Sequence, residues 1–264
     1  MNKATVTVGK SIIPTYHEPA AEEMPMFSEN RVHQRSSGRP YPNKVVLKVN
    51  REEKVDKEYE VVTLENKYLK IEILPEIGGR IYSALDKTTG YDFFYKQHVI
   101  KPALIGVLGS WISGGVEFNW PFHHRASGFM PCDYTIEECE DGTKICWLSE
   151  HDPIDRMKGM VSIILRPGET SFETRMRLYN RTSADKSFLW WENAAVAVHE
   201  DYRLIFPPDV TWVHHHNDAG HTTFPIAQGQ YGADNITLAD NRYNYLAVIF
   251  FLIYRKHNTL SVVV

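Results

Sequence analysis

Three absences narrow the class of protein before any motif is considered. The chain has only three cysteines, Cys132, Cys139 and Cys146, and no two of them are closely spaced. This pattern describes neither a disulfide framework nor a zinc knuckle, so we expect reduced, packed thiols and no bound metal or other cofactor. The chain also lacks an excess of basic residues, and its formal net charge is -4. Nucleic acid and anionic membrane surfaces recruit basic faces, so neither is expected as a partner.

The sequence also has no long hydrophobic run. Its most apolar segment, YNYLAVIFFLIY at 243–254, is well short of the roughly 20 residues that span a bilayer. This segment predicts either a buried strand or an exposed, aggregation-prone one. The first residues, MNKATVTVGKSIIP, alternate Val and Thr where an export signal would have an apolar core. We therefore expect no membrane partner and a cytoplasmic location.

Helical periodicity is scarce, and the two-residue period of β-strands is common. In KYLKIEILP (67–75), Leu69, Ile71 and Ile73 alternate with charged residues, as in a half-buried strand. Similar segments occur at 4–13, 44–49, 59–66, 80–86, 144–152, 159–168 and 170–180, and 187–199 reads as a buried strand. Residues 17–43 are rich in Pro, Glu and Ser and indicate an extended connector. The fold class expected is all-β, an antiparallel sandwich or barrel, with no helix beyond about three turns.

The most unusual stretch is Gly114–Pro131, which reads GGVEFNWPFHHRASGFMP. It combines a carboxylate, an amide, two imidazoles and a guanidinium with four aromatic rings. Its glycines and prolines predict an irregular backbone, and polar groups set among aromatics on such a segment are typical of a small-molecule site. The alternative is a long crossover whose aromatics fill one end of the core and whose histidines are structural.

Candidate catalytic residues are those that could transfer protons or attack a sugar. Glycoside hydrolysis needs two carboxylates around the scissile bond, whereas a sugar epimerase can use a histidine with a carboxylate. These requirements select Glu117, His123, His124, His151 and Glu192. The alternative for either glutamate is a structural ion pair with Arg80 or Arg125, and for each histidine a hydrogen-bonded structural role.

Candidate ligand-binding residues are the polar and aromatic groups around these. They are Arg80, Asn119, Trp120, Arg125, Asp152 and Trp191. Indoles can pack on pyranose rings, although core packing is the alternative role for Trp120 and Trp191. The run His214–His216 with His221 lacks the spacing of a zinc site on a strand and is expected to be a solvated loop.

Several segments resemble known families. VTLENKYLKIEILPEIGGRIYSALDKTTGYDFFY (62–95) is similar to the opening of galactose mutarotase-like domains, the aldose 1-epimerase supersandwich. The segments 109–138, 147–168 and 188–213, with the motifs EFNWPFHHR, SEHDP and FPPDVTWV, resemble a family of bacterial domains of unknown function in the same superfamily. Members of that family precede tetratricopeptide repeats in longer chains. The resemblance covers roughly residues 55–232 and implies an antiparallel β-supersandwich with a carbohydrate ligand.

The chain departs from the epimerase pattern in three places. Glu192 stands about where an epimerase has a catalytic histidine, the late catalytic glutamate has no clear counterpart, and residues from about 235 onward do not resemble the family. We therefore expect an N-terminal strand and connector (1–54), a supersandwich domain (55–234) and an atypical apolar tail (235–264). A truncated or frameshifted product would lack late strands, pack its tail poorly and be inactive.

The function expected is a carbohydrate-active, glycoside-processing domain. The alternatives are a non-catalytic carbohydrate-binding or scaffold module and a mutarotase-type epimerase. If the domain processes glycosides, one cleft should contain Glu117, Arg125, Glu192 and one of His123 and His124. The carboxyl groups of Glu117 and Glu192 should then lie within about 10 Å of each other.

Overall fold

The structure is a computed structural model. It describes residues 3–18, 20–21, 23, 48–104, 110–121, 124–125, 128–153, 155–197, 199, 203–214, 221–231, 234–235, 237–238 and 240. These residues belong to two compact units, one up to Val196 and one from Ala197 onward. All regular elements of the described residues are β-strands, and none of those residues forms a helix that could cross a membrane. Most of the connector predicted at 17–43 and of the tail predicted at 235–264 lies outside the described residues.

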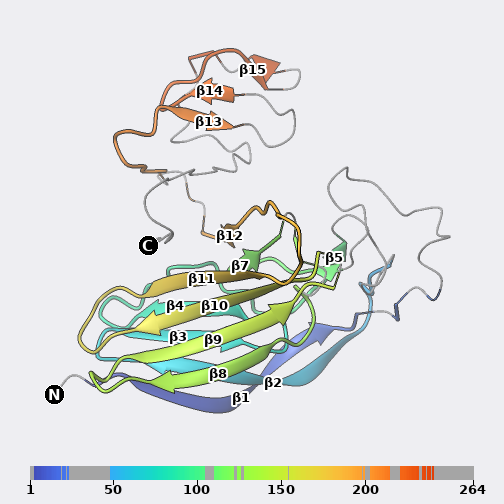
Figure 1. The fold of residues 1–264 in the computed structure, drawn as a ribbon, viewed down its shortest axis with the longest axis vertical. Coiled ribbons are helices and arrows are strands. Elements are labelled where there is room, and N and C mark those ends of the chain that lie inside the picture. Colours follow the sequence, from blue (N-terminus) through green and yellow to red (C-terminus); the bar gives the residue numbers. More distant parts are fainter. Residues whose placement is uncertain are drawn as a thin grey trace. The chain divides into compact units, whose positions relative to one another are not determined.

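The first unit contains a six-stranded antiparallel sheet (Figure 1). Its strands, in spatial order, are β1 (Thr5–Tyr16), β2 (Lys54–Glu65), β3 (Leu69–Leu74), β4 (Arg80–Asp86), β7 (Val116–Asn119) and β12 (Trp191–Ala194). The strand β1 pairs with β2 over its whole length, so the N-terminal strand is an integral part of this sheet. The last two strands come from segments far apart in the sequence, and their pairing creates the candidate site.

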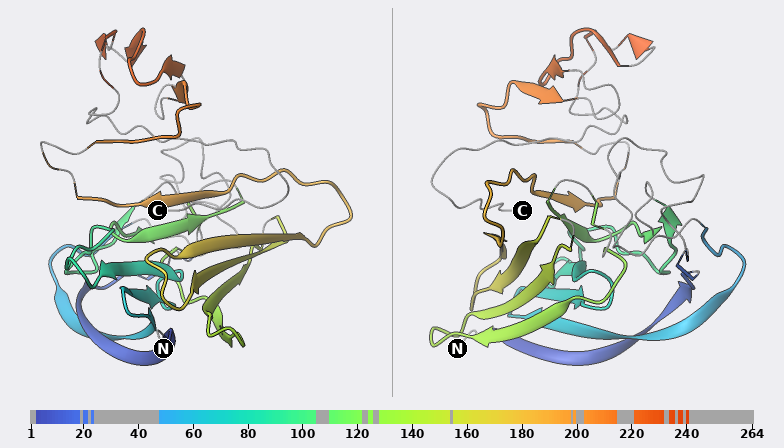
Figure 2. Two further views of the ribbon diagram at one scale, coloured as in Figure 1. Left: turned by 90° about the vertical axis from the view of Figure 1, so that its left-hand side faces the viewer. Right: turned by 45° about the vertical axis from the view of Figure 1, so that its right-hand side comes forward.

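A four-stranded antiparallel sheet forms the second layer of this unit (Figures 1 and 2). Its spatial order is β11 (Glu173–Asn180), β10 (Met157–Leu165), β9 (Lys144–His151) and β8 (Asp133–Glu138). A short pair, β5 (Ala103–Leu104) and β6 (Ser110–Trp111), lies in the same unit. The second unit has two short pairs, β13 (Trp212–His214) with β14 (His221–Thr223) and β15 (Gln230–Tyr231) with β16 (Asp234–Asn235).

The main hydrophobic core lies between the two sheets. It joins Leu64, Ile71 and Val116 of the six-stranded sheet to Leu148 and Ile163 of the four-stranded one. Because strand side chains alternate between faces, each sheet contributes one apolar face to this layer. The prediction of an all-β antiparallel sandwich is therefore confirmed.

Two local predictions need correction. The central stretch is not irregular throughout, because Val116–Asn119 forms β7, whose four residues are all buried. The buried strand predicted at 187–199 is shorter, since only Trp191–Ala194 pairs, and none of these four residues is fully buried. The reason is its position: among the described strands, β12 is at the edge of the sheet and pairs with β7 alone.

The outer face of the six-stranded sheet, which points away from the main core, carries a second apolar cluster. Tyr59, Leu74 and Tyr82 pack there against Ile100 and Ile112 of the connection between β4 and β7. This connection therefore covers part of the outer face. The candidate site lies beside it on the same face.

Asn66 ties the two sheets together at one end of the sandwich. Its side-chain amide donates to the carbonyls of Arg166 (2.9 Å) and Glu169 (2.8 Å) in the β10–β11 turn. Its Oδ1 accepts from the backbone N–H groups of Tyr68 and Leu69, both at 2.8 Å. All the hydrogen-bonding capacity of one buried amide is thus used to join two turns.

Replacing Asn66 with alanine should destabilise the fold strongly. Asn66→Ala leaves two carbonyls and two N–H groups without their partner, and we expect a loss of about 3 kcal/mol in the free energy of unfolding. Chemical denaturation measures it. The control is Asn180→Ala, because the exposed side chain of Asn180 bonds to Thr182 and Ala184, both nearby in the sequence, and joins no distant segments among the described residues. Equal effects of the two substitutions would contradict this role of Asn66.

Gly159 on β10 makes room for the Trp120 indole. A Cβ at this position would lie 2.1 Å from Trp120 Cε2. Neighbouring groups restrict movement of the indole: its ring centroid lies 5.9 Å from that of Trp190, which stacks on it, and 4.1 Å from the Arg125 guanidinium. The absence of a side chain at 159 is therefore required by packing.

Gly159→Ala should consequently destabilise the protein by about 1–3 kcal/mol through overpacking. The matched control is Gly9→Ala on β1, where no atom lies within 4 Å of the new Cβ. We expect a change within about 0.5 kcal/mol for that variant. Thermal and urea unfolding of both variants provide the comparison, and a stable Gly159→Ala protein would show that the indole can move aside.

Candidate functional site

Three strands of the six-stranded sheet present one polar row on its outer face. In the β7–β12 ladder, Glu117 lies opposite Asn193 and Asn119 lies opposite Trp191. On the other side of β7, Ile81 pairs with Val116, and one step along the same register Arg80 comes opposite Glu117. We call Arg80, Glu117 and Asn193 the polar row. Alternation places their side chains on the same face, next to the connection that carries Trp111.

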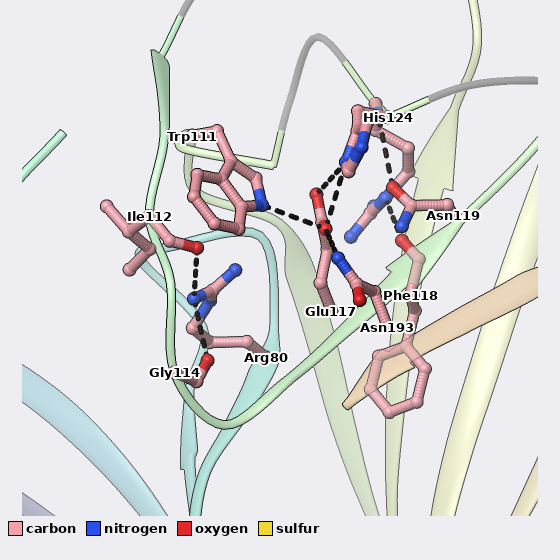
Figure 3. Close-up of polar contacts among 10 residues, drawn as sticks. Arg80, Trp111, Ile112, Gly114, Glu117, Phe118, Asn119, His124 and Asn193 are labelled. Carbon is pink, nitrogen blue, oxygen red and sulfur yellow. Dashed lines mark hydrogen bonds and ion pairs between the residues drawn. The ribbon is translucent and has the colours of Figure 1, made fainter. Parts of the chain in front are cut away.

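Glu117 is the centre of this row (Figure 3). It is only 5% exposed, yet it accepts hydrogen bonds from Trp111 Nε1 (3.1 Å), His124 Nδ1 (3.0 Å) and Asn193 Nδ2 (3.3 Å). Burial by itself would raise the pKa of Glu117. The bond from His124 and the charges of His124 and Arg80 outweigh it, so the pKa is lowered from its ordinary value. Glu117 is therefore an ionised, fixed carboxylate.

Arg80 is a buried cation, 3% exposed, at the other end of the row. One terminal nitrogen donates to the carbonyls of Ile112 (2.9 Å) and Gly114 (3.0 Å), as Figure 3 shows. Its Nε is buried without a hydrogen-bond partner in the described structure. Burial lowers the pKa of Arg80 to about 10, with Glu117 opposing the shift and Arg125 adding to it. The guanidinium remains charged at neutral pH.

His124 is a partly accessible partner of Glu117. Its side chain is 22% exposed, and its ring makes edge contacts with Trp191 (4.6 Å between centroids) and Trp111 (6.3 Å). Because His124 donates to Glu117 through Nδ1, the other ring nitrogen, Nε2, lies on the side of the ring away from the carboxylate. A carboxylate–imidazole pair of this kind fixes the ring and leaves one nitrogen for a ligand.

Arg125 anchors the segment that delivers His124. Its guanidinium forms an ion pair with Glu150 of β9 and donates to the carbonyls of Phe118 (2.7 Å) and Gly78 (2.6 Å). Its backbone N–H donates to Asn119 Oδ1 at 3.2 Å. These contacts link the segment to both sheets and to the β3–β4 turn.

The structure brings together five of the predicted residues and separates Glu192 from them. Arg80, Glu117, Asn119, His124 and Trp191 lie around the outer face just described. Arg125 follows His124 in the chain, but its guanidinium contacts Trp120 of the main core and Glu150 of the other sheet. Glu192 pairs with Phe118, whose ring lies in the main core, and it accepts a 2.7 Å hydrogen bond from Thr174 of the opposite sheet. The expectation that Glu117 and Glu192 share one cleft is wrong, because adjacent rungs of a strand point to opposite faces.

The remaining predicted residues lie elsewhere. Trp120 is buried in the main core, packed against Trp190 and Arg125. His151 is exposed at the end of β9, on the face opposite to that of core residues Cys146 and Leu148. Asp152 accepts from the backbone N–H of Asp155 in the turn that follows. His123 lies outside the described residues.

Sequence reasoning missed three residues of the site: Trp111, Asn193 and Glu150. Asn193 could have been found, since it follows Glu192 in an expected strand and must face the other way. Trp111 reaches Glu117 across an irregular connection, and Glu150 reaches Arg125 from the second sheet. Neither contact has a signal in sequence spacing.

The comparisons with known proteins agree with the fold. Residues 38–243 match the family described as "Domain of unknown function (DUF5107)", and the chain belongs to that family. A TPR-domain containing protein from Parabacteroides distasonis ATCC 8503, known from a crystal structure, is similar over 84% of this chain, with a TM-score of 0.73 and 22% identity. This chain spans 37% of that protein's length. At such identity the likeness shows the fold.

The two glutamates should respond oppositely to removal of their charge. The lowered pKa of Glu117 means that its ionised form contributes stability above the ordinary value of 4.5, which is lost as pH falls through the lowered pKa. The pKa of Glu192 is raised, by burial first and despite the Thr174 hydrogen bond, so its charge costs stability as pH rises through the raised pKa.

At pH 7, Glu117→Gln should therefore lower the free energy of unfolding by about 1–3 kcal/mol, because its three donors lose an ionised acceptor. Glu192→Gln should leave stability unchanged or increase it. Both differences should shrink as pH falls below 4.5. Urea unfolding between pH 3 and pH 8 tests this, and a larger loss from Glu192→Gln than from Glu117→Gln would contradict the two placements.

Proposed function

We propose that this chain is a carbohydrate-binding domain whose ligand contacts His124 between the indoles of Trp111 and Trp191. The observation that supports it most is the fixed Glu117–His124 pair, which points one imidazole nitrogen away from a buried carboxylate. Sugar sites combine a few directed polar groups with aromatic surfaces, and this cluster offers both. The proposal includes membership of the galactose mutarotase-like superfamily, with which the two-sheet antiparallel architecture is consistent.

Binding is favoured over glycoside hydrolysis. Hydrolysis requires two carboxyl groups on either side of one bond. Glu192 faces the core, and Glu150 is engaged by Arg125, which leaves Glu117 as the acid of the polar row. Glu117 itself is held by three donors and is almost inaccessible, so it is better suited to orienting His124 than to attacking a sugar.

Mutarotase-type epimerisation is the second candidate function. It needs proton transfer to or from an anomeric hydroxyl, and an imidazole oriented by a carboxylate can perform that transfer near neutral pH. The Glu117–His124 hydrogen bond is the specific observation that favours it. Carbohydrate binding and epimerisation share a sugar as the ligand, so sugar binding must be established before epimerase activity is tested. We also propose that longer relatives of this domain carry tetratricopeptide repeats after it. The cytoplasmic location of the protein stays a prediction.

The test is a panel of monosaccharides and short oligosaccharides measured by saturation-transfer NMR and calorimetry. We expect at least one member to bind, and His124→Ala to weaken it by about 10-fold, the value of one good hydrogen bond and its ring contacts. His151→Ala is the matched control, because His151 is exposed on the far face of the other sheet. Absence of binding across the panel at millimolar concentrations would refute the proposal, as would equal effects of the two alanine variants.

A further inference from the structure

The candidate site has unused hydrogen-bond donors. In the described part of the chain, four buried side-chain polar atoms have no hydrogen-bond partner: Arg80 Nε, Asn119 Nδ2, Thr143 Oγ1 and Trp191 Nε1. Three of them belong to the site around Glu117, and all three are N–H donors. Buried polar groups in folded proteins are nearly always paired, so a cluster of unpaired donors calls for an acceptor.

Two of these donors are neighbours on adjacent strands. Asn119 and Trp191 are directly opposite in the β7–β12 ladder, so their side chains lie side by side on the outer face. Asn119 is fully buried, its Oδ1 accepts from the backbone N–H of Arg125, and its side chain helps to lower the pKa of Glu117. The Trp191 ring lies 4.6 Å from that of His124, so Trp191 is next to the proposed ligand contact and Asn119 is its neighbour in the ladder.

The unpaired donors of the site favour a group that only accepts hydrogen bonds. Arg80 donates to the backbone carbonyls of Ile112 and Gly114, while Glu117, which faces it, already accepts from Trp111, His124 and Asn193. Glu117 is the acid of the polar row, and Glu150 is paired with Arg125. A neutral sugar hydroxyl both donates and accepts, whereas the unused groups here only donate.

We propose that the site selects a sugar acid, with the carboxylate of a uronate accepting from the Trp191 and Asn119 N–H groups beside His124. This inference rests on the proposed carbohydrate function and adds the ligand class to it. A carboxylate is an acceptor-only group, and hydrogen bonds to ionised acceptors are stronger than those between neutral groups.

The experiment compares matched ligands on the full chain by calorimetry and saturation-transfer NMR. The pairs are glucose with glucuronate and galactose with galacturonate, and acetate is the carboxylate without a ring. We expect at least one uronate to bind about 10-fold or more tightly than its neutral partner and than acetate, with an affinity that falls as salt is added. Equal affinity within both pairs, or acetate binding as tightly as the uronates, would overturn the inference.

The variant Trp191→Phe isolates the donor. Phenylalanine retains an aromatic ring and removes the N–H, and no described hydrogen bond of the free protein is lost. We expect the ratio of uronate affinity to neutral-sugar affinity to fall by about 5–10-fold, while thermal stability stays unchanged. An unchanged preference would overturn the inference.

The outcomes also separate the two proposals. Neutral sugars that bind with no preference for their acids would refute the ligand class and leave the carbohydrate function intact. Failure of every sugar, acidic or neutral, would refute both.

Discussion

The pairing of β7 with β12 is the constraint on which the site depends. It joins segments more than 70 residues apart, and its register decides which side chains meet: Glu117 with Asn193, and Phe118 with Glu192. A shift by one residue would exchange the faces, putting Glu192 into the polar row and Asn193 into the core. Phe118 resists that shift, because its ring stacks on Trp190 in the interior. Core packing on one face thus fixes the chemistry on the other.

A second constraint is the cost of burying charge. Glu117, Arg80 and Arg125 are all almost inaccessible, and an isolated charge in that position would be strongly unfavourable. The structure offsets this cost with directed partners: three donors for Glu117, and an ion pair and two carbonyls for Arg125. Arg80 is the exception, since its partners are backbone carbonyls and one N–H is unpaired. Unpaired buried polar groups are rare in folded proteins, so this N–H calls for an explanation, and a bound ligand is one.

The sequence was sufficient for the fold class. Two-residue periodicity locates β3, β4, β9, β10 and β11 within a few residues, because these strands have one clearly apolar face. The cluster in Gly114–Pro131 contains Glu117, Asn119, His124 and Arg125, which the structure links by hydrogen bonds, and their role in binding stays a prediction. Face assignment failed for Glu192, because its charge suggested a ligand and its strand register was unknown. Trp111 and Glu150 could not be predicted, since irregular connections and contacts between sheets leave no periodic signal.

The arrangement of hydrogen-bonding groups in the site determines which ligand would complement it. Glu117 accepts from His124 Nδ1, so Nε2 is the ring nitrogen on the side away from the carboxylate. Trp191, whose indole N–H is unpaired, contacts the same ring, and Asn119 lies opposite Trp191 on β7. A complementary ligand would meet the imidazole at one point and accept a hydrogen bond at a neighbouring one. A sugar ring with a hydroxyl beside a carboxylate has that arrangement, and because the protein groups are fixed before a ligand arrives, little ordering cost would oppose its binding.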